Sequence, residues 1–478
     1  MKTFLETLNS NVKKFTTPLL FLLIILIPFS VRYVFHTPWN FQTGAYSDFT
    51  SLSLYISDFV LLALLLFSAF HIPRFLSLDS LWNKLAYGTI GWLLLELLVQ
   101  NYSTFPLQLY FSLRLVLLII LGLFISKIDF SKNDVTRGTD QQTNFLSKGL
   151  TRKNIAWLFV LLGGIQSIIA ILQFYLQHSL GLYIVGESHL SPLLLGVAKI
   201  VSHGTTLIRG YGTFPHPNLL AGFLVTTTLF NLYLLNKTIQ QQNSDSSEIG
   251  AEISRGTWNL YKVYIFLFLN IYGLFITFSR GGIIALFVGI SVIISYYIYN
   301  GEFSRGTFSK ISKLLNPLIC IVLLSIIMLW PYLGTRATFT DTATKERLFY
   351  NTIGIKMMET KPILGLGTGQ SVLHMKQFSN EDLEPWEIQP IHNYFLISIA
   401  EQGIGAILLI LLVVLPTYRL IKRGFTDWGL ILISINVAIM FLFILDHYFY
   451  TIWQTQLLLW VVIGLTLNES QKKSSAEE

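Results

Sequence analysis

Cysteine and charged residues are scarce in this 478-residue chain. Its single cysteine, Cys320, lies inside a long apolar run, which excludes an intramolecular disulfide and a metal site built from cysteines. Charged residues make up only 12% of the chain, hydrophobic residues make up 53%, and the mean hydropathy is +0.58. This composition excludes an ordinary soluble domain and indicates a protein that crosses a membrane several times.

Common motifs for metal binding are also missing. The sequence contains no Asp-x-Asp, and none of its nine histidines belongs to a His-x-x-x-His pair. The sequence therefore predicts no metal site and no cofactor.

Long apolar runs fill most of the chain. Segments of about 17 to 25 apolar residues cross a bilayer as helices, because no backbone polar group can stay unpaired in hydrocarbon. The sequence predicts an all-α integral membrane protein, with residues 1–478 as a single polytopic domain. About twelve transmembrane helices are expected, near residues 16–35, 52–72, 84–100, 105–126, 154–176, 217–236, 261–278, 282–299, 314–334, 392–415, 428–446 and 451–467.

Lysine and arginine set the expected orientation, because cytoplasmic loops carry an excess of both. The basic stretches at residues 127–153 and 419–423 place their loops in the cytoplasm. With the N-terminus also inside, an even number of spans returns the C-terminus to the cytoplasm. The net charge of +7 then follows from topology. Membrane lipids are expected partners, and nucleic acid is not.

Two segments on the expected outer side, residues 177–216 and 335–391, are too long and too rich in glycine, proline, histidine and aromatic residues to be simple linkers. The second is a predicted extracytoplasmic loop before the tenth span, with a short helix expected just after Arg347. Polar and charged residues that can bind a ligand lie in these segments and at nearby helix ends. They are Arg209, His216, Asn218, Arg280, Arg336, Arg347, Lys361, His392, Asn393, Asp446 and His447.

Two residue types in this group suggest chemistry. An arginine at the end of a span is costly to desolvate and normally has an anionic partner, and its planar fork of donors suits phosphate oxygens. Arg280 and Arg347 are the main candidates. His392, at the expected water boundary, can accept a proton from a hydroxyl. The structural alternatives are that Arg280 reaches toward lipid headgroups and that His392 only packs.

The glycine pattern of residues 361–369 superficially resembles a nucleotide-binding loop. No strand precedes it, so we expect a turn-rich segment that shapes a cavity. Three ionisable residues, Asp58, Glu96 and Arg114, lie within predicted spans. They are expected to pair with one another or to line a polar cavity.

Four motifs occur in order. They are Arg-Gly-Tyr-Gly-Thr-Phe-x-His-Pro-Asn from Arg209, Ser-Arg-Gly-Gly from Ser279, Arg347 followed by Lys-Pro-Ile-Leu-Gly-Leu-Gly-x-Gly from Lys361, and His-Asn-x9-Gly from His392. Together they resemble the O-antigen ligase and O-antigen polymerase superfamily of bacterial membrane glycosyltransferases. The similarity covers residues 200–450. One departure, Gly-Ile-Gly-Ala at residues 403–406 in place of Gly-x-x-Gly, is expected to affect helix packing more than chemistry.

The resemblance implies a GT-C-like fold and a metal-independent, inverting glycosyltransferase. The implied donor is a glycan linked to undecaprenyl pyrophosphate, and the acceptor is a hydroxyl of a glycan, lipid or protein at the outer face of the bacterial cytoplasmic membrane. Arg280, Arg347 and His392 match the family's catalytic positions. Such a reaction belongs to the biosynthesis of lipopolysaccharide or another surface polysaccharide.

Three alternatives stay open at this point. A polysaccharide polymerase and a protein O-oligosaccharyltransferase would use the same donor. A lipid-linked glycan flippase or transporter would need polar groups near the bilayer midplane and access to both faces. The candidate residues cluster on one face, which favours transfer over transport.

Overall fold

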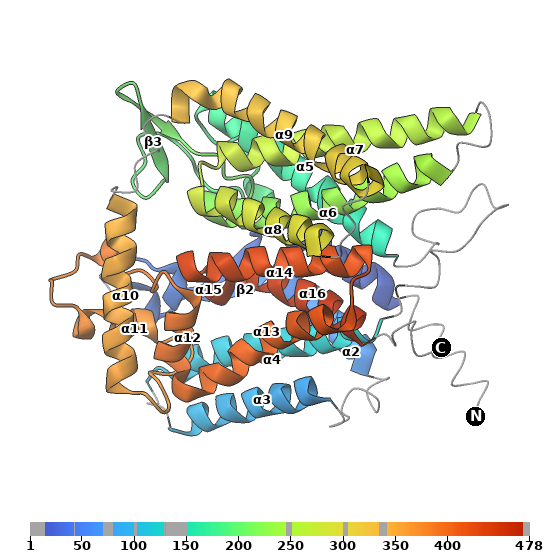
Figure 1. Cartoon of the computed structure of the whole chain (residues 1–478). Helices are drawn as coiled ribbons and strands as arrows, with labels where there is room; N and C mark the ends of the chain where they lie inside the picture. Colours follow the sequence, from blue (N-terminus) through green and yellow to red (C-terminus); the bar gives the residue numbers. More distant parts are fainter. Residues whose placement is uncertain are drawn as a thin grey trace.

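The structure, a computed structural model, describes residues 15–42, 44–69, 80–99, 103–128, 130, 151–244, 251–299, 305–333 and 342–471. Most of these residues form helices packed side by side (Figure 1). The helices are an unlabelled first helix (Phe15–Leu26), α2 (Ile56–Ala69), α3 (Leu81–Val99), α4 (Phe105–Ser126), α5 (Arg152–Leu176), α6 (Pro217–Ser244), α7 (Ala251–Ile276), α8 (Arg280–Tyr299), α9 (Arg305–Leu333), α10 (Thr342–Thr360), α11 (Ser371–Phe378), α12 (Tyr394–Gln402), α13 (Ala406–Arg423), α14 (Asp427–Leu445), α15 (Tyr448–Thr451) and α16 (Trp453–Ser470).

The prediction of an all-α integral membrane protein is confirmed. Within the described ranges, eight helices are long and apolar enough to cross a membrane, with α12 and α13 joined as one segment, Tyr394–Arg423. Two further apolar helices, Phe15–Leu26 and Ile56–Phe67, are shorter. The number of twelve spans therefore stays a prediction.

The first two predicted spans are each wrong at one end. Residues predicted to be helical instead form an antiparallel pair of strands, β1 (Arg32–Phe35) and β2 (Leu52–Tyr55), in which Arg32 lies opposite Tyr55. Side-chain exposure alternates along both strands, as expected for a hairpin with two different faces. The physical reason for the error is that a short apolar run next to a helix does not reveal where the helix ends.

One end of the bundle carries most of the irregular structure, and we call it the α10 end. Helix α10 runs across the ends of the long helices there, beside α11 and α12 (Figure 1). A second hairpin, β3 (Lys199–Ser202) and β4 (Thr205–Ile208), lies at the same end. The Ser202 hydroxyl donates to the carbonyl of Pro331 at 2.8 Å, which ties this hairpin to the end of α9. Helix α10 includes the short helix expected just after Arg347, but it begins at Thr342, so Arg347 lies inside the helix.

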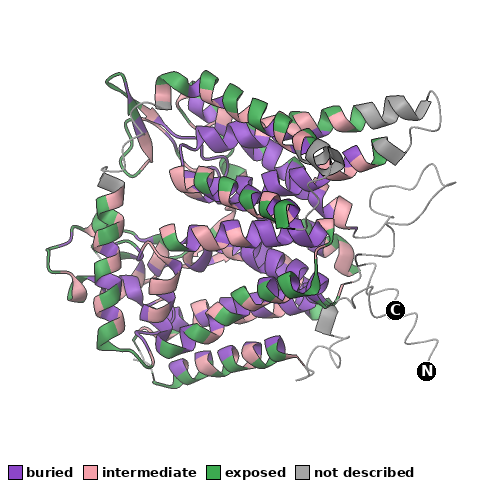
Figure 2. Ribbon diagram, in the orientation of Figure 1, coloured by how far each residue is buried: buried purple, intermediate pink, exposed green. Residues whose placement is uncertain are grey.

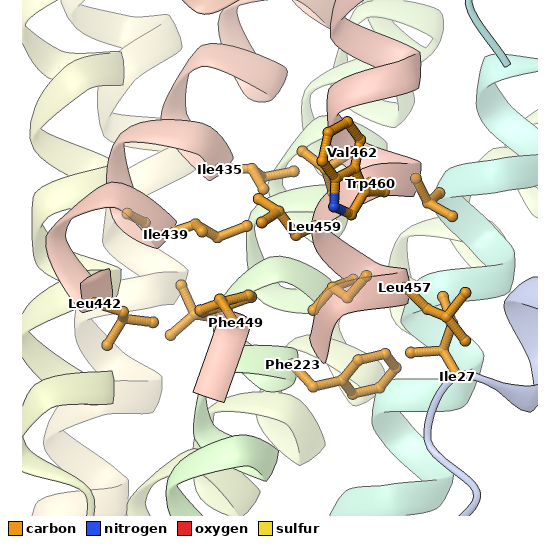
Figure 3. Close-up of a cluster of buried hydrophobic side chains, with 14 of the residues drawn as sticks. Ile27, Phe223, Ile435, Ile439, Leu442, Phe449, Leu457, Leu459, Trp460 and Val462 are labelled. Carbon is orange, nitrogen blue, oxygen red and sulfur yellow. The ribbon is translucent and has the colours of Figure 1, made fainter. Parts of the chain in front are cut away.

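The core lies where α6, α14 and α16 meet. Figure 2 shows buried residues concentrated at the centre of the bundle and exposed residues along outer helices such as α3 and α9. In Figure 3, Phe223 from α6, Ile439 from α14 and Leu457 from α16 belong to one apolar cluster. Large apolar side chains exposed on α9, including Ile327 and Trp330, suit a helix that faces lipid.

The glycine pattern of residues 361–369 packs against the break between α12 and α13. The backbone N–H of Leu366 donates to the carbonyl of Ala400 at 2.9 Å, and that of Gly367 donates to the carbonyl of Glu401 at 2.7 Å. These bonds satisfy carbonyls at the end of α12 that have no partner within the helix. The loop therefore fixes how the two helices that follow it meet.

Two glycines make this close approach possible. A Cβ atom on Gly365 would lie 2.2 Å from the carbonyl oxygen of Glu401, and one on Gly403 would lie 2.1 Å from that of Ile363. Both glycines also have a positive φ, 67° and 56°, which side chains disfavour. Backbone packing accounts for these glycines without any nucleotide.

We expect Gly403→Ala to lower the free energy of unfolding by about 3 to 5 kcal/mol, since it combines a left-handed backbone with a backbone clash. The matched control is Gly424→Ala, which also has a positive φ, 93°, but has no atom within 4 Å of the added Cβ. The control should cost only about 1 to 2 kcal/mol. Thermal unfolding of the purified protein in detergent measures both, and equal shifts would contradict the proposed packing.

Candidate functional site

A cavity of about 750 Å³ lies among residues that are far apart in the sequence. This volume is in the range of sites that bind small molecules and cofactors. Eight of the eleven candidate residues line it, namely Arg209, His216, Asn218, Arg280, Arg347, His392, Asp446 and His447. The structure thus brings together side chains from the starts of α6 and α8, from α10, and from the segments before α12 and after α14.

The other three candidates lie elsewhere. Arg336 falls outside the described residues. Lys361 lines a second cavity, of about 730 Å³, together with Glu96. Asn393 is the N-cap of α12, where its side-chain oxygen accepts from the backbone N–H of Leu396 at 3.0 Å. The sequence could not distinguish a capping role of Asn393 from a binding role, because this residue directly follows His392.

Arg209 is held at the cavity by fixed hydrogen bonds. Its Nε donates to the carbonyl of Thr277 at 2.6 Å, and its Nη2 donates to Oδ1 of Asn218 at 2.8 Å. The Asn218 amide in turn donates to Oδ2 of Asp446 at 3.2 Å. One amide at the start of α6 therefore connects the guanidinium of Arg209 with a carboxylate at the end of α14.

Arg280 is placed by a tight turn between α7 and α8. Phe278 adopts a left-handed φ of 48°, and the hydroxyl of Ser279 accepts from the backbone N–H of Gly282 at 3.3 Å. Arg280 is thus the first residue of α8, where the unpaired backbone N–H groups of a helix start favour an anion. A Cβ on Gly282 would lie 2.7 Å from that of Ala221, so glycine allows α8 to pack closely on α6.

Asp446 lies at the centre of the charged groups and is only 7% exposed. Its Oδ2 is 3.9 Å from Nη2 of Arg347, and its Oδ1 accepts from the backbone N–H of His447 at 2.9 Å. The Nε2 atom of His447 lies 3.7 Å from the same oxygen. This carboxylate can therefore orient both a cation and an imidazole.

His392 packs between two aromatic rings. Its ring stacks on Tyr350 of α10 with 5.2 Å between centroids, and it meets the His447 ring edge-on at 5.0 Å. Tyr350 is itself held by a hydrogen bond from its hydroxyl to the carbonyl of Glu387 at 2.6 Å. The buried Nδ1 of His392 has no hydrogen-bond partner among the described residues. This nitrogen is a candidate to meet a ligand.

The three histidines at the cavity favour the uncharged form. Burial lowers the pKa of His392, and it lowers the pKa of both His216 and His447 to about 3. Burial alone would raise the pKa of Asp446, but the guanidinium of Arg347 and the backbone N–H of His447 help to hold this pKa below its usual value. At neutral pH, the site thus offers an ionised carboxylate, arginine cations and imidazoles that can accept a proton.

The same group can also be considered as a metal site. One ligand atom from each of His392, Asp446 and His447 lies within 4.8 Å of the other two. Two imidazoles and a carboxylate are a donor set that zinc accepts. Against this, the guanidinium of Arg347 already faces the carboxylate at 3.9 Å and repels a cation. Sequence spacing could not reveal this group, because its members come from two separate loops.

Sequence reasoning missed part of the cavity lining. Arg32, Asp48 and Gln454 line the cavity but belong to the first hairpin region and to the last helix. Their polar character within or beside apolar runs was the only available signal. The embedded charges were expected to pair with one another or to line a polar cavity. Arg114 pairs with Asp58 at 2.6 Å, and Glu96, which accepts a hydrogen bond from Thr368 at 2.8 Å, lines the second cavity.

A comparison with protein families supplies an independent assignment. Residues 265–411 match the family model described as O-antigen ligase. Residues 265–411 therefore form an O-antigen ligase region. The matched region contains Arg280, Arg347 and His392 and confirms the resemblance seen in the motifs. No curated protein matches the chain in a sequence comparison.

The O-antigen ligase region, together with the apolar helices, points to a multi-pass membrane protein with glycosyltransferase-like activity. In general terms, it implies a lipid-linked glycan and an acceptor as partners.

The N-cap role of Asn393 predicts a purely structural effect of substitution. Asn393→Ala should lower the free energy of unfolding by about 1 kcal/mol, whereas Asn393→Ser, which retains a capping oxygen, should remain close to the parent protein. Thermal unfolding in detergent measures the difference. An Asn393→Ser protein that is fully stable but no longer binds a lipid-linked glycan would contradict this role.

Proposed function

We propose that this protein transfers a glycan from undecaprenyl pyrophosphate to an acceptor hydroxyl at the outer face of the bacterial cytoplasmic membrane. The proposal depends on one observation above all. Arg209, Arg280, Arg347 and His392 line a single cavity at the α10 end of the bundle. A diphosphate needs several cations, and a hydroxyl nucleophile needs a proton acceptor, so these residues supply both requirements together.

The leaving group explains why arginines suffice on the donor side. Pyrophosphate leaves with its charge spread over several oxygens, so glycosyl transfer needs positive groups aimed at those oxygens more than it needs a strong acid. Arg280 and Arg347 are assigned to the pyrophosphate, and the start of α8 adds backbone N–H donors beside Arg280. Arg209, fixed by Thr277 and Asn218, shapes the same side of the cavity.

His392 is assigned to the acceptor. The acceptor hydroxyl oxygen attacks the anomeric carbon, a new glycosidic bond forms, and the bond between that carbon and the pyrophosphate oxygen breaks with its electron pair going to undecaprenyl pyrophosphate. The hydroxyl proton passes to the uncharged imidazole of His392. Attack opposite to the leaving group inverts the anomeric carbon. His447 contacts His392, and the negative charge of Asp446 stabilises the cation that forms on His392.

The acceptor decides between ligase, polymerase and protein O-oligosaccharyltransferase. All three would use the donor side described above and would differ in what approaches His392. The polyprenyl chain of the donor would stay in the bilayer while its head enters the cavity between helices. A direct assay with lipid A–core oligosaccharide, a second carrier-linked glycan and a polypeptide as acceptors separates the three reactions, and flipping without a new glycosidic bond would favour transport instead.

We expect Arg280→Ala, Arg347→Ala and His392→Ala each to lower glycan transfer by about 10² to 10³-fold, the usual loss when a group that stabilises transition-state charge or moves the proton is removed. Transfer from undecaprenyl-pyrophosphate-linked glycan is measured with purified protein in the presence of EDTA. Arg423→Ala, at the end of α13 and away from the cavity lining, is the matched control and should keep full activity.

Two results would count against this mechanism. Full activity of the folded Arg280→Ala protein would remove the proposed donor site. Loss of the parent protein's activity in EDTA, with recovery on adding zinc, would assign His392, Asp446 and His447 to a metal instead.

The lowered pKa of His392 sets the expected pH dependence. A base must be uncharged to act, and a pKa below the usual 6.5 keeps this imidazole uncharged down to lower pH. Transfer should therefore stay nearly constant from about pH 8 to about pH 6.5 and fall only at lower pH. The pH profile of kcat/KM tests this. A half-loss at or above about pH 6.5 would show that His392 titrates normally or is not the base.

A further inference from the structure

The cavity has a second wall that lies outside the region matched by the O-antigen ligase family model. It is made by the β1–β2 hairpin, the short helix η2 (Asp48–Thr50) and the start of α16. Its polar residues are Arg32, Asp48 and Gln454, and we call them the hairpin wall. None of these residues has a part in the transfer step described above.

Charges on this side of the cavity are paired at short range. Arg32 contacts both carboxylate oxygens of Asp48, at 2.7 and 2.8 Å, and also donates to the hydroxyl of Tyr55 at 3.1 Å. Nearby Arg114 is paired with Asp58 at 2.6 Å. Each of these two cations has its own carboxylate, so this side attracts a neutral polar ligand better than a second anion.

The side-chain oxygen of Gln454 indicates where a ligand can bind. This residue is only 2% exposed, and its Nε2 donates to the hydroxyl of Ser30 at 2.5 Å. Its Oε1 has no hydrogen-bond partner among the described residues, although the residue lines the cavity. A buried acceptor without a donor costs free energy, and a donor entering the cavity removes that cost.

Ring contacts also connect the hairpin wall to His392, the proposed base. The ring of Phe49, next to Asp48 in η2, meets the ring of His447 with 5.5 Å between centroids. His447 in turn meets His392 at 5.0 Å. A chain of ring contacts therefore joins the hairpin wall to the proposed base.

We propose that the hairpin wall is the subsite for a neutral sugar of the acceptor, which it holds through hydroxyl groups. The inference rests on the proposed function. One sugar hydroxyl donates to Oε1 of Gln454, a second donates to Asp48, and a sugar oxygen accepts from Arg32. A ligand bound there lies in the same cavity as His392, to which it presents a hydroxyl.

The test measures the KM for the donor and the KM for the acceptor separately, with purified full-length protein. The donor is undecaprenyl-pyrophosphate-linked glycan. Lipid A–core oligosaccharide and a second carrier-linked glycan are used in parallel as acceptor probes. Gln454→Met should raise the acceptor KM about fivefold to tenfold, the effect of one lost hydrogen bond, and leave the donor KM within about twofold. Asp48→Asn should act in the same direction.

Two further variants separate recognition from packing. Gln454→Glu keeps an acceptor oxygen, since the Ser30 hydroxyl can reverse and donate to it, and should restore most of the acceptor KM. Gln456→Met is the matched control, because this glutamine lies on the same helix but does not line the cavity, and it should leave both KM values unchanged.

The outcomes are distinct. A rise in the acceptor KM alone supports the subsite. A rise in the donor KM, no change in either value, or an equal effect of Gln456→Met would overturn it while leaving the transfer reaction intact. No transfer by the parent protein to either probe would instead remove the proposed function, and the subsite with it.

Discussion

The buried carboxylate of Asp446 is the interaction on which the arrangement of the cavity depends. It accepts hydrogen bonds from Asn218 and from the backbone of His447, and it faces the guanidinium of Arg347. A carboxylate in a low-dielectric site is stable only while such partners surround it. Its burial therefore holds the start of α6, helix α10 and the segment after α14 in one geometry, and each partner becomes part of the same site.

Helix packing supplies the rigidity that this geometry needs. The loop at residues 361–369 packs against the end of α12, and the carboxylate of Glu401 there accepts from Gly369, Ser371 and Tyr450. His392 lies two residues before α12, so a shift of this helix would displace the imidazole from the charged groups around it. The glycines of the loop thus affect chemistry without contacting a substrate, by fixing the helix that carries the proposed base.

The sequence predicted the membrane class and most of the cavity, for two physical reasons. Hydrophobic spans leave few places for charged residues, and topology assigns the ends of those spans to one face or the other. Arg209, Arg280 and Arg347 could therefore be grouped from the order of spans and loops alone. Topology fixes depth but not lateral position, which is why Lys361 was grouped with them although it lines a different cavity.

The remaining part of the cavity lining could not be predicted from the hydrophobic pattern of the sequence. The strands that carry Arg32 and Tyr55 lie next to apolar helices in the sequence, so the hydrophobic pattern does not reveal that they turn toward the cavity. The family match contains Arg280, Arg347 and His392, whereas the hairpin wall lies outside it, as do Arg209, Asp446 and His447. Donor chemistry is common to any acceptor, but recognition must differ between acceptors. The hairpin wall can therefore differ between transferases that share a donor but use different acceptors.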